Sequence, residues 1–450
     1  MTLLTKRGCL LAAASVVVLS GTPGRGVTAS AADKVSEWDQ IAEDTVLRAG
    51  AFQGEGFVYM GYVSAAVYDA AVAIDPRYEP YRGGVTAPRG ASADAAVVEA
   101  AYRTLLHYFP AQSAQLDPRY AASLATIGDG PAKVAGQAVG QAAADLIVAL
   151  RANDGVRTPV ATTSEFPHRT PGPGVWRLTP PGFAAPQTPW LGGVTPFLVD
   201  DVERFRLDGP PSLDSFEWVE AYEEVKRFGG ADSTVRTPAQ GATALFFTAN
   251  VIRQFNRAVR DVIQAESLCL TDAARLQAMV NMTGADALIG ALNAKYHFLF
   301  WRPVTAIDPS SVKPAPGDGF GPIPGYSDPS PFTIEQAGWR PFAGATPNHP
   351  EYPAAHGSIT SAMAEVFSAF LDTNRFNLVL HGFDPAGAPG NLDAVRTYRM
   401  AAALRDEVVN ARVWAGFHYR FSTRVGEDMG RKVADHAVKN FMQPVAVATR

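Results

Sequence analysis

Cysteine is almost missing from this sequence, because its 450 residues include only Cys9 and Cys269. Cys9 lies in an N-terminal segment that we expect to be removed. The mature chain should therefore contain no internal disulfide and must be held together by its hydrophobic core. With 47% hydrophobic residues, the chain has enough apolar surface for a large core.

Charge is also scarce in this chain. Only 18% of the residues are charged, and the net charge is -5. This balance excludes the broad basic field of proteins that bind nucleic acid without sequence preference, so we expect no nucleic-acid partner. Any site for an anion must be local.

The sequence offers no convincing membrane span. The apolar stretch of residues 10–19 is too short to cross a bilayer, and Lys6 and Arg7 precede it. The small residues Ala29-Ser30-Ala31 follow it as a cleavage site, and this order is typical of a secretory signal. We therefore predict a signal peptide over residues 1–31 and a secreted protein.

Motifs of the common metal and nucleotide sites are missing too. The sequence contains no HExxH motif, CxxC pair, EF-hand loop or P-loop. The glycines of "GDGFGPIPG" at residues 317–325 follow no predicted strand, which argues against a nucleotide site.

Much of the chain shows the apolar periodicity of α-helices. Apolar residues recur at three- and four-residue spacing, with many alanines, over residues 37–50, 57–74, 93–109, 131–153 and 275–301. Alanine-rich faces let helices pack closely. We therefore predict an all-α protein built from helical bundles.

Two stretches rich in Pro and Gly, residues 154–211 and 303–352, interrupt the helical pattern. Loops this long inside a compact domain are usually functional or disordered, and the second leads straight into His356, which favours a functional loop. We divide the chain into a signal peptide (1–31), an N-terminal helical bundle with a Pro-rich loop (32–240) and a C-terminal bundle with an oxyanion site (241–450).

The first chemically informative stretch is "KYHFLFWRP". Lys295 and Arg302 are seven residues apart, about two helical turns, so we expect them on nearly the same helix face. The aromatic residues between them indicate a buried neighbourhood, and buried positive charges need an anion. A solvated pair of basic side chains is the alternative.

The second stretch is "YPAAHGSIT", residues 352–360. Pro353 suits a first helical turn and a helical apolar pattern follows Ser358, so residues 354–357 should lie at a helix N-terminus. Free backbone N–H groups at such an end bind anions. His356 would sit beside the anion and exchange a proton near neutral pH, unless it is only a capping or core histidine.

The third stretch is "ARVWAGFHYRFS", in which His418 follows Arg412 by six residues. Six helical steps place two side chains on different faces. For both to reach one centre, the helix must bend or end near Gly416.

These stretches, in this order, resemble the vanadium-dependent haloperoxidases and the related type 2 phosphatidic acid phosphatases. That superfamily has a Lys separated by six residues from Arg-Pro, then Pro-Ser-Gly-His, then an Arg with a His six positions on. Residues 65–81 and 173–197 also look like bacterial haloperoxidase-like proteins, so the resemblance covers most of the mature chain. It implies two helical bundles packed into one unit. The matching residues are Lys295 with Arg302-Pro303, Pro353-Ala354-Ala355-His356, and Arg412 with His418.

The resemblance also implies what the cationic residues do. Lys295, Arg302 and Arg412 would hold the oxygens of a bound oxyanion, and the backbone N–H near Ala355 would add a donor. Lys295 would in addition take part in catalysis. Vanadate is the implied cofactor, and phosphate has the same shape and charge.

The three histidines receive different roles from the resemblance. His418 would be the axial ligand of the vanadium, or the nucleophile of a phosphatase. His356 would be the acid/base partner. His349 stands where algal bromoperoxidases carry a second histidine, so it would tune the halide preference, unless it is only a loop histidine in water.

Two residues depart from the superfamily pattern. Ala354 replaces the usual Ser, which removes one hydroxyl donor and costs about 1.5–3 kcal/mol of oxyanion binding. Ser422 stands where many phosphatases have an Asp that orients the nucleophilic histidine, so we expect a missing or weaker partner for His418.

The implied function is a secreted, vanadate-dependent haloperoxidase. It would oxidise a halide with hydrogen peroxide, and the hypohalous acid would react with a small-molecule acceptor. An acid phosphatase of the same fold that acts through phospho-His418 is one alternative. An inactive protein that only binds an oxyanion is another.

Overall fold

The computed structural model of the chain describes residues 33–160, 172–309, 327–371, 376–382 and 394–445. The predicted signal peptide lies outside these residues, so the signal and the export stay predictions. Cys269 is not a free thiol in the structure. The expectation of a mature chain without an internal disulfide depends on the removal of Cys9, which lies outside the described residues as well.

The described residues form a mainly helical molecule, which confirms the all-α prediction. The predicted helical stretches are found in α1, α2, α3, α5 and α9. The α-helices are α1 (Asp33–Arg48), α2 (Gln53–Ile74), α3 (Ala93–Tyr108), α4 (Ser113–Ala125), α5 (Pro131–Leu150), α6 (Phe216–Gly229), α7 (Pro238–Phe246), α8 (Val251–Ala265), α9 (Leu270–Phe298), α10 (Pro303–Ile307), α11 (Ala355–Leu371), α12 (Ala401–Trp414) and α13 (Arg420–Asn440). Three short 3-10 helices are η1 (Pro110–Gln112), η3 (Pro189–Gly193) and η4 (Val202–Phe205).

The sequence analysis missed one small sheet. Strands β1 (Leu378–His381) and β2 (Val395–Tyr398) pair antiparallel, with Leu378 opposite Tyr398. Each strand has only four residues, which is too short for a clear alternating pattern.

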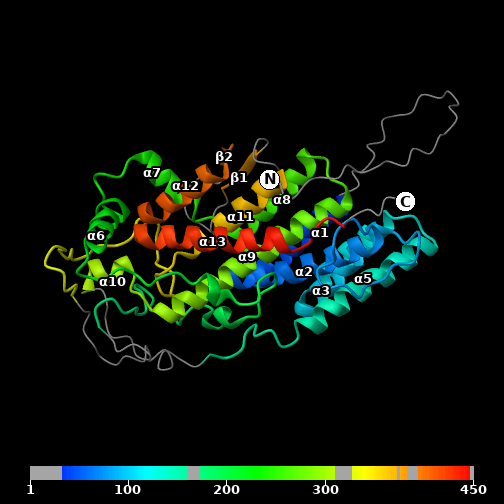
Figure 1. Cartoon of the computed structure of the whole chain (residues 1–450), viewed down its shortest axis with the longest axis horizontal. Helices are drawn as coiled ribbons and strands as arrows, with labels where there is room; N and C mark the ends of the chain where they lie inside the picture. Colours follow the sequence, from blue (N-terminus) through cyan, green and yellow to red (C-terminus); the bar gives the residue numbers. More distant parts are fainter. Residues whose placement is uncertain (1–32, 161–171, 310–326, 372–375, 383–393, 446–450) are drawn as a thin grey trace.

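The molecule is elongated, with α3 and α5 at one end and α6 and α10 at the other (Figure 1). Helix α9 lies in the middle and packs against α2, α11 and α13. Almost every residue of its 29-residue length is buried, because neighbours surround it on all sides. This explains why its sequence is apolar or small all round rather than amphipathic.

One described helix, α2, is long and apolar enough to cross a membrane by length and composition, and 89% of its most apolar window is buried inside the protein. It packs against α3, α5 and α9. Its apolar surface is therefore the surface of a core helix.

One hydrophobic cluster runs through both predicted bundles. It joins Phe57 and Met60 of α2 to Met279 of α9 and Phe367 of α11. Helix α6 packs on α10, α12 and α13 instead, through a second cluster around Trp218. The domain boundary between residues 240 and 241 stays a prediction.

Two glycines of α13 let it approach α11 closely. A Cβ on Gly430 would lie 2.0 Å from the backbone oxygen of Ser358, and one on Gly426 would lie 2.3 Å from that of Ala354. No side chain fits in these gaps. The close contact holds the first turn of α11 against the second and third turns of α13.

The two Pro- and Gly-rich loops bind each other and the segment that follows α9. Trp301 donates its backbone N–H to the oxygen of Gly174 at 3.0 Å, and Glu351 donates to that of Phe300 at 2.9 Å. In addition, the side-chain oxygen of Asn348 accepts from the Thr179 hydroxyl at 2.7 Å. These bonds bury the stretch between Lys295 and Arg302.

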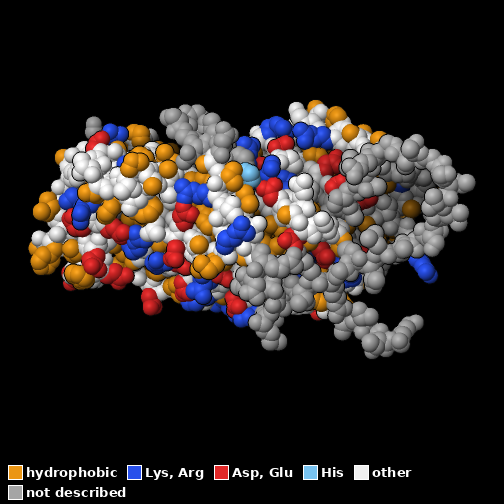
Figure 2. Space-filling model, turned by 90° about the horizontal axis from the view of Figure 1, so that it is seen from above, with side chains coloured by type: hydrophobic (Ala, Val, Ile, Leu, Met, Phe, Trp, Pro, Cys, Tyr) orange, Lys and Arg blue, Asp and Glu red, His pale blue; other side chains and the backbone are white. Residues whose placement is uncertain are grey.

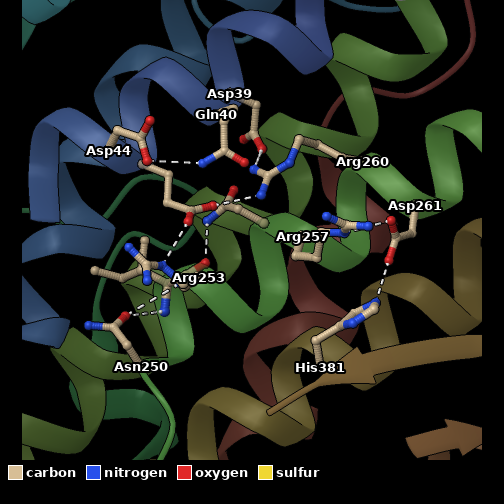
Figure 3. Close-up of polar contacts among 12 residues, drawn as sticks. Asp39, Gln40, Asp44, Asn250, Arg253, Arg257, Arg260, Asp261 and His381 are labelled. Atoms are coloured by element: carbon tan, nitrogen blue, oxygen red, sulfur yellow. Dashed lines mark hydrogen bonds and ion pairs between the residues drawn. The ribbon is translucent and has the colours of Figure 1, made fainter. Parts of the chain in front are cut away.

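A buried ion network ties α1 to α8 (Figure 3). Arg260 of α8 contacts both Asp39 and Glu43 of α1, and Arg253 reaches Glu43 at 3.2 Å. Gln277 of α9 adds a hydrogen bond to Asp39 at 3.0 Å. Both carboxylates are almost fully buried, so these partners are required to offset their lost hydration.

Candidate active site

A cavity of about 80 Å³ lies where the first turns of α2, α8 and α11 meet. One wall is apolar and the other carries titratable side chains. Its lining consists of Phe52, Gln53, Gly54, Val251, Leu288, Leu292, Pro347, His349, Ala355, His356, Ile359, Arg412 and His418.

The helix N-termini make this cavity favourable for an anion. Helices α2, α8 and α11 begin at Gln53, Val251 and Ala355, and each of these residues lines the cavity. The positive end of each helix dipole therefore faces it. In α11 the first intrahelical bond runs from Ser358 to Ala354, so the N–H groups of the first turn have no intrahelical acceptor. The predicted helix N-terminus at residues 354–357 is confirmed.

Lys295 lies in the last turn of α9 and is fully buried. Its Nζ donates to the backbone oxygens of Pro350 at 2.8 Å and Glu351 at 2.7 Å. Burial, and then the charge of Arg302, hold the pKa of Lys295 well below its ordinary value. A nearby anion would favour its charged form.

Arg302 is the N-cap residue of α10 and is also fully buried. Its Nη1 donates to the oxygen of Phe417 at 2.9 Å and lies 3.2 Å from Nε2 of His418. Its Nη2 lies 3.0 Å from Nδ1 of His349. Burial lowers the pKa of Arg302 to about 10.

The expectation that Lys295 and Arg302 share one helix face is wrong. Helix α9 ends at Phe298, and Leu299 adopts a left-handed backbone conformation. The chain turns there before Arg302 begins α10. The charge of Arg302 acts on Lys295 across this turn, so the two cations are not related by helical spacing.

Arg412 lies in the last turn of α12 and is 2% exposed. Its Nη1 donates to the backbone oxygen of Phe247 at 2.9 Å. Its Nε has no hydrogen-bond partner among the described residues. Burial lowers the pKa of Arg412 to about 9. A buried guanidinium with a spare N–H, beside a cavity, is a donor suited to an oxyanion.

His418 reaches the same cavity because α12 ends before it. The helix stops at Trp414 and Gly416 has a φ of 84°, a conformation that glycine adopts without strain. A Cβ at Gly416 would lie 2.3 Å from the backbone oxygen of Gly229. The expectation that the helix ends near Gly416 is confirmed.

The sequence analysis missed Glu351. Its Oε1 lies 2.7 Å from Nδ1 of His418 and accepts the backbone N–H of Tyr419 at 3.1 Å. Burial raises its pKa to about 7. The expectation that Ser422 leaves His418 with a missing or weaker partner is therefore wrong, because Glu351 supplies a carboxylate from a different part of the chain. A lone acidic residue between Pro350 and Tyr352 was the only signal in the sequence.

His356 and His349 lie on the cavity wall. His356 is the second residue of α11 and is partly buried. Burial, and then the charge of Arg412, keep its pKa well below the ordinary value. His349 is buried, and its ring meets that of Phe52 edge to face, with centroids 6.3 Å apart. Burial and the charge of Arg302 also lower the pKa of His349.

The donor set fits an oxyanion of the vanadate or phosphate type. Three buried cations, Lys295, Arg302 and Arg412, act on His418, the carboxylate of Glu351 contacts the same ring, and Arg412 has an Nε–H without a partner among the described residues. Positive charge therefore exceeds negative charge at this place. Ala354 adds no donor, because it has no hydroxyl and its N–H bonds the oxygen of Ser422 at 3.1 Å.

Comparison with known proteins finds a matching domain in the C-terminal part of the chain. Residues 275–446 match the model of the VCPO second helical-bundle domain, and this range includes Lys295, Arg302, Arg412 and the three histidines of the candidate site. Vanadium chloroperoxidase of Curvularia inaequalis is 26% identical over 294 residues. That alignment covers 54% of this chain and 47% of the relative, so the chain spans about half the length of the curated protein that it matches.

Solved structures share the fold over most of the chain. A bacterial vanadium-dependent iodoperoxidase superposes with a TM-score of 0.71 and 17% identity, over 92% of this chain and 97% of the other. A holo-type bacterial vanadium-dependent chloroperoxidase superposes with a TM-score of 0.64 and 17% identity, over 92% and 100%. Residues 275–446 therefore match a vanadium chloroperoxidase domain, and the chain shares its fold with bacterial vanadium-dependent haloperoxidases.

Proposed function

We propose that the protein is a secreted, vanadate-dependent haloperoxidase that oxidises a halide with hydrogen peroxide and so halogenates a small-molecule acceptor. The observation that carries this proposal is that the charges of three buried cations, Lys295, Arg302 and Arg412, all act on His418. Its ring lines one cavity together with Arg412. Vanadate, when bound, would supply an electrophilic metal centre at which hydrogen peroxide becomes reactive toward halide.

The cationic residues bind and neutralise the oxyanion in this proposal. Arg412 offers its unpartnered Nε–H, and the first turn of α11 offers backbone N–H groups. Lys295 and Arg302 supply positive charge from fully buried positions. Because these groups are held by backbone carbonyls, they need little reorganisation when negative charge develops.

The two histidines have separate tasks. Nε2 of His418, which faces Nη1 of Arg302 at 3.2 Å, would bind the oxyanion, while its Nδ1 is held by Glu351 at 2.7 Å. His356 lies on the cavity wall at the start of α11 and gives or takes a proton. The small volume of the cavity, about 80 Å³, suits peroxide and halide rather than a bulky organic molecule beside the oxyanion.

Acid phosphatase activity is a second candidate, and the Glu351–His418 contact favours it. A carboxylate that orients a histidine is what nucleophilic catalysis requires. Nε2 of His418 would form a bond to phosphorus while the ester P–O bond breaks, and His356 would give a proton to the leaving oxygen. Water would then release phosphate and free His418.

Two assays on the purified mature protein decide between these functions. Bromination of a dye is measured with vanadate, hydrogen peroxide and bromide, and hydrolysis of a phosphate monoester is measured without vanadate. Vanadate-dependent bromination supports the proposal, whereas hydrolysis alone supports the phosphatase. Neither activity, combined with tight phosphate binding, would identify an inactive oxyanion-binding protein.

A further inference from the structure

The two ring nitrogens of His418 face groups of opposite hydrogen-bonding character. Nδ1 lies 2.7 Å from Oε1 of Glu351, and Nε2 lies 3.2 Å from Nη1 of Arg302. A guanidinium can only donate, so Nε2 must be the acceptor of this ring. A neutral imidazole carries one ring proton, so Nδ1 must hold it and can donate it to Oε1 of Glu351. Both contacts indicate the same tautomer.

Glu351 is itself held in place from several sides. Its Oε1 also accepts the N–H of Tyr419 at 3.1 Å, and its backbone oxygen accepts from Lys295 at 2.7 Å. Its backbone N–H donates to Phe300 at 2.9 Å. The carboxylate is fully buried, and Oε2 has no partner among the described residues. The ring of His418 is therefore the side chain whose hydrogen bond to this buried carboxylate is shortest, at 2.7 Å.

We propose that Glu351 is the positioning residue of His418: it holds the proton on Nδ1 and keeps the lone pair of Nε2 directed at the bound oxyanion. This inference rests on the proposed function. Ser422, the residue at the position where related phosphatases carry an orienting Asp, places its hydroxyl 3.5 Å from the backbone oxygen of Glu351 and supports the carboxylate rather than replacing it. The carboxylate therefore comes from the loop before α11 instead of from α13.

If Glu351 positions His418, replacing Glu351 should weaken the binding of vanadate more than the binding of phosphate. Vanadate binding requires Nε2 as a ligand, whereas phosphate is held by the cations and N–H groups alone. Loss of the partner that orients a metal-binding histidine typically weakens metal affinity about 10- to 100-fold. Loss of a negative charge beside an anion site has the opposite sign, because it removes repulsion. The ratio of the vanadate affinity to the phosphate affinity therefore separates the two effects. Loss of His418 orientation lowers this ratio, whereas loss of the negative charge acts on both anions.

The experiment compares the full-length mature protein with Glu351→Leu and Glu351→Gln. Dissociation constants for vanadate and for inorganic phosphate are measured by titration, and the His418 tautomer is read by nitrogen-15 NMR without any ligand. We expect Nδ1–H in the wild type. In Glu351→Leu, the affinity for vanadate should fall about 10- to 100-fold and the affinity for phosphate should change little. The ring of His418 should then no longer be held in one tautomer. The nearly isosteric Glu351→Gln, whose amide oxygen still accepts, should lie between.

Asp286→Asn is the matched control. Asp286 is a fully buried carboxylate too, but it accepts the backbone N–H groups of Phe197 and Leu198 and does not line the cavity. This variant should leave the vanadate-to-phosphate ratio unchanged. An unchanged ratio in both Glu351 variants, or an equal loss for both anions, would overturn the positioning role. A wild type that does not prefer vanadate to phosphate would instead refute the proposed function, and the tautomer measurement would still test Glu351.

Discussion

The two titratable rings closest to the first turn of α11 differ in what holds them. His418 is fixed by Glu351 and Arg302 at its two nitrogens, whereas His356 is partly buried on the cavity wall. His418→Ala should abolish tight vanadate binding and all turnover. His356→Ala should keep much of the binding but lower turnover about 10²–10⁴-fold, because it removes only proton transfer.

These two variants are compared by vanadate titration of the apo protein and by turnover at saturating vanadate. Circular dichroism checks that both remain folded. If His418→Ala bound vanadate as tightly as the wild type, the axial ligand would have to be another residue.

The halide preference is a prediction about His349. This ring lies on the cavity wall, with Nδ1 3.0 Å from Nη2 of Arg302. By its resemblance to the second histidine of bromoperoxidases, we expect efficient oxidation of bromide and iodide and poor oxidation of chloride. Initial rates with the three halides test this, with His349→Phe as the variant that removes the ring nitrogens. Efficient chloride oxidation by the wild type would show that the comparison fails.

At the scale of elements, the network between α1 and α8 should contribute strongly to stability. Arg260 contacts Asp39 and Glu43, and its side chain is 12% exposed. Arg260→Met would leave two buried carboxylates with weaker partners, so we expect a loss of about 3–5 kcal/mol in the free energy of unfolding. Chemical denaturation measures this loss.

Arg257 of the same helix is the matched control (Figure 3). Its side chain is 48% exposed and pairs with Asp261 at 2.8 Å. Because solvent screens such a pair, Arg257→Met should change the free energy of unfolding by less than about 1 kcal/mol. Similar losses for both variants would mean that burial does not determine the strength of this network.

The same carboxylates predict how stability depends on pH. Burial raises the pKa of Asp39 to about 6 and that of Glu43 to about 7, above the ordinary values of 3.8 and 4.5. The folded protein therefore binds more protons than the unfolded chain between about pH 4 and pH 7. By linkage, this pair contributes less stability as the pH rises through that window.

The double variant Asp39→Asn/Glu43→Gln lacks this titration. Its free energy of unfolding, minus that of the wild type, should therefore increase from pH 4.5 to pH 7.5. Urea denaturation at both values measures the difference. A difference that stays constant or falls would show that these two pKa values are not raised in the folded protein.

At the scale of the whole molecule, the surface charges are mixed. Lys and Arg side chains alternate with Asp and Glu side chains over the face seen in Figure 2. The net charge is -5. An anionic cofactor would therefore be attracted by the cations and helix N-termini at the cavity rather than by the molecule as a whole.

The continuous core predicts cooperative unfolding. Helix α2 packs directly on α9, and one hydrophobic cluster contains Trp38 of α1 together with Val433 of α13. Neither half can lose its structure without exposing the apolar face of the other. We expect a single calorimetric transition, coincident with the loss of circular dichroism and of tryptophan fluorescence. Two separated transitions would support independent bundles for residues 32–240 and 241–450.

The sequence by itself determined the helices and the chemical identity of much of the candidate site. Apolar periodicity is a local property, so α2, α3, α5 and α9 could be recognised without knowledge of their neighbours. The start of α11 at Ala355 and the end of α12 near Gly416 were predicted for the same reason. Helix ends depend on residues that are adjacent along the chain.

Only the tertiary structure decided how these residues meet. Glu351 and His418 are 67 positions apart, and no spacing rule connects a carboxylate in the loop before α11 to a ring between α12 and α13. The nearness of Lys295 and Arg302 depends on the turn at Leu299 and on hydrogen bonds from two distant loops. Such contacts are set by which surfaces pack together, and that choice is made by the whole core rather than by any one segment.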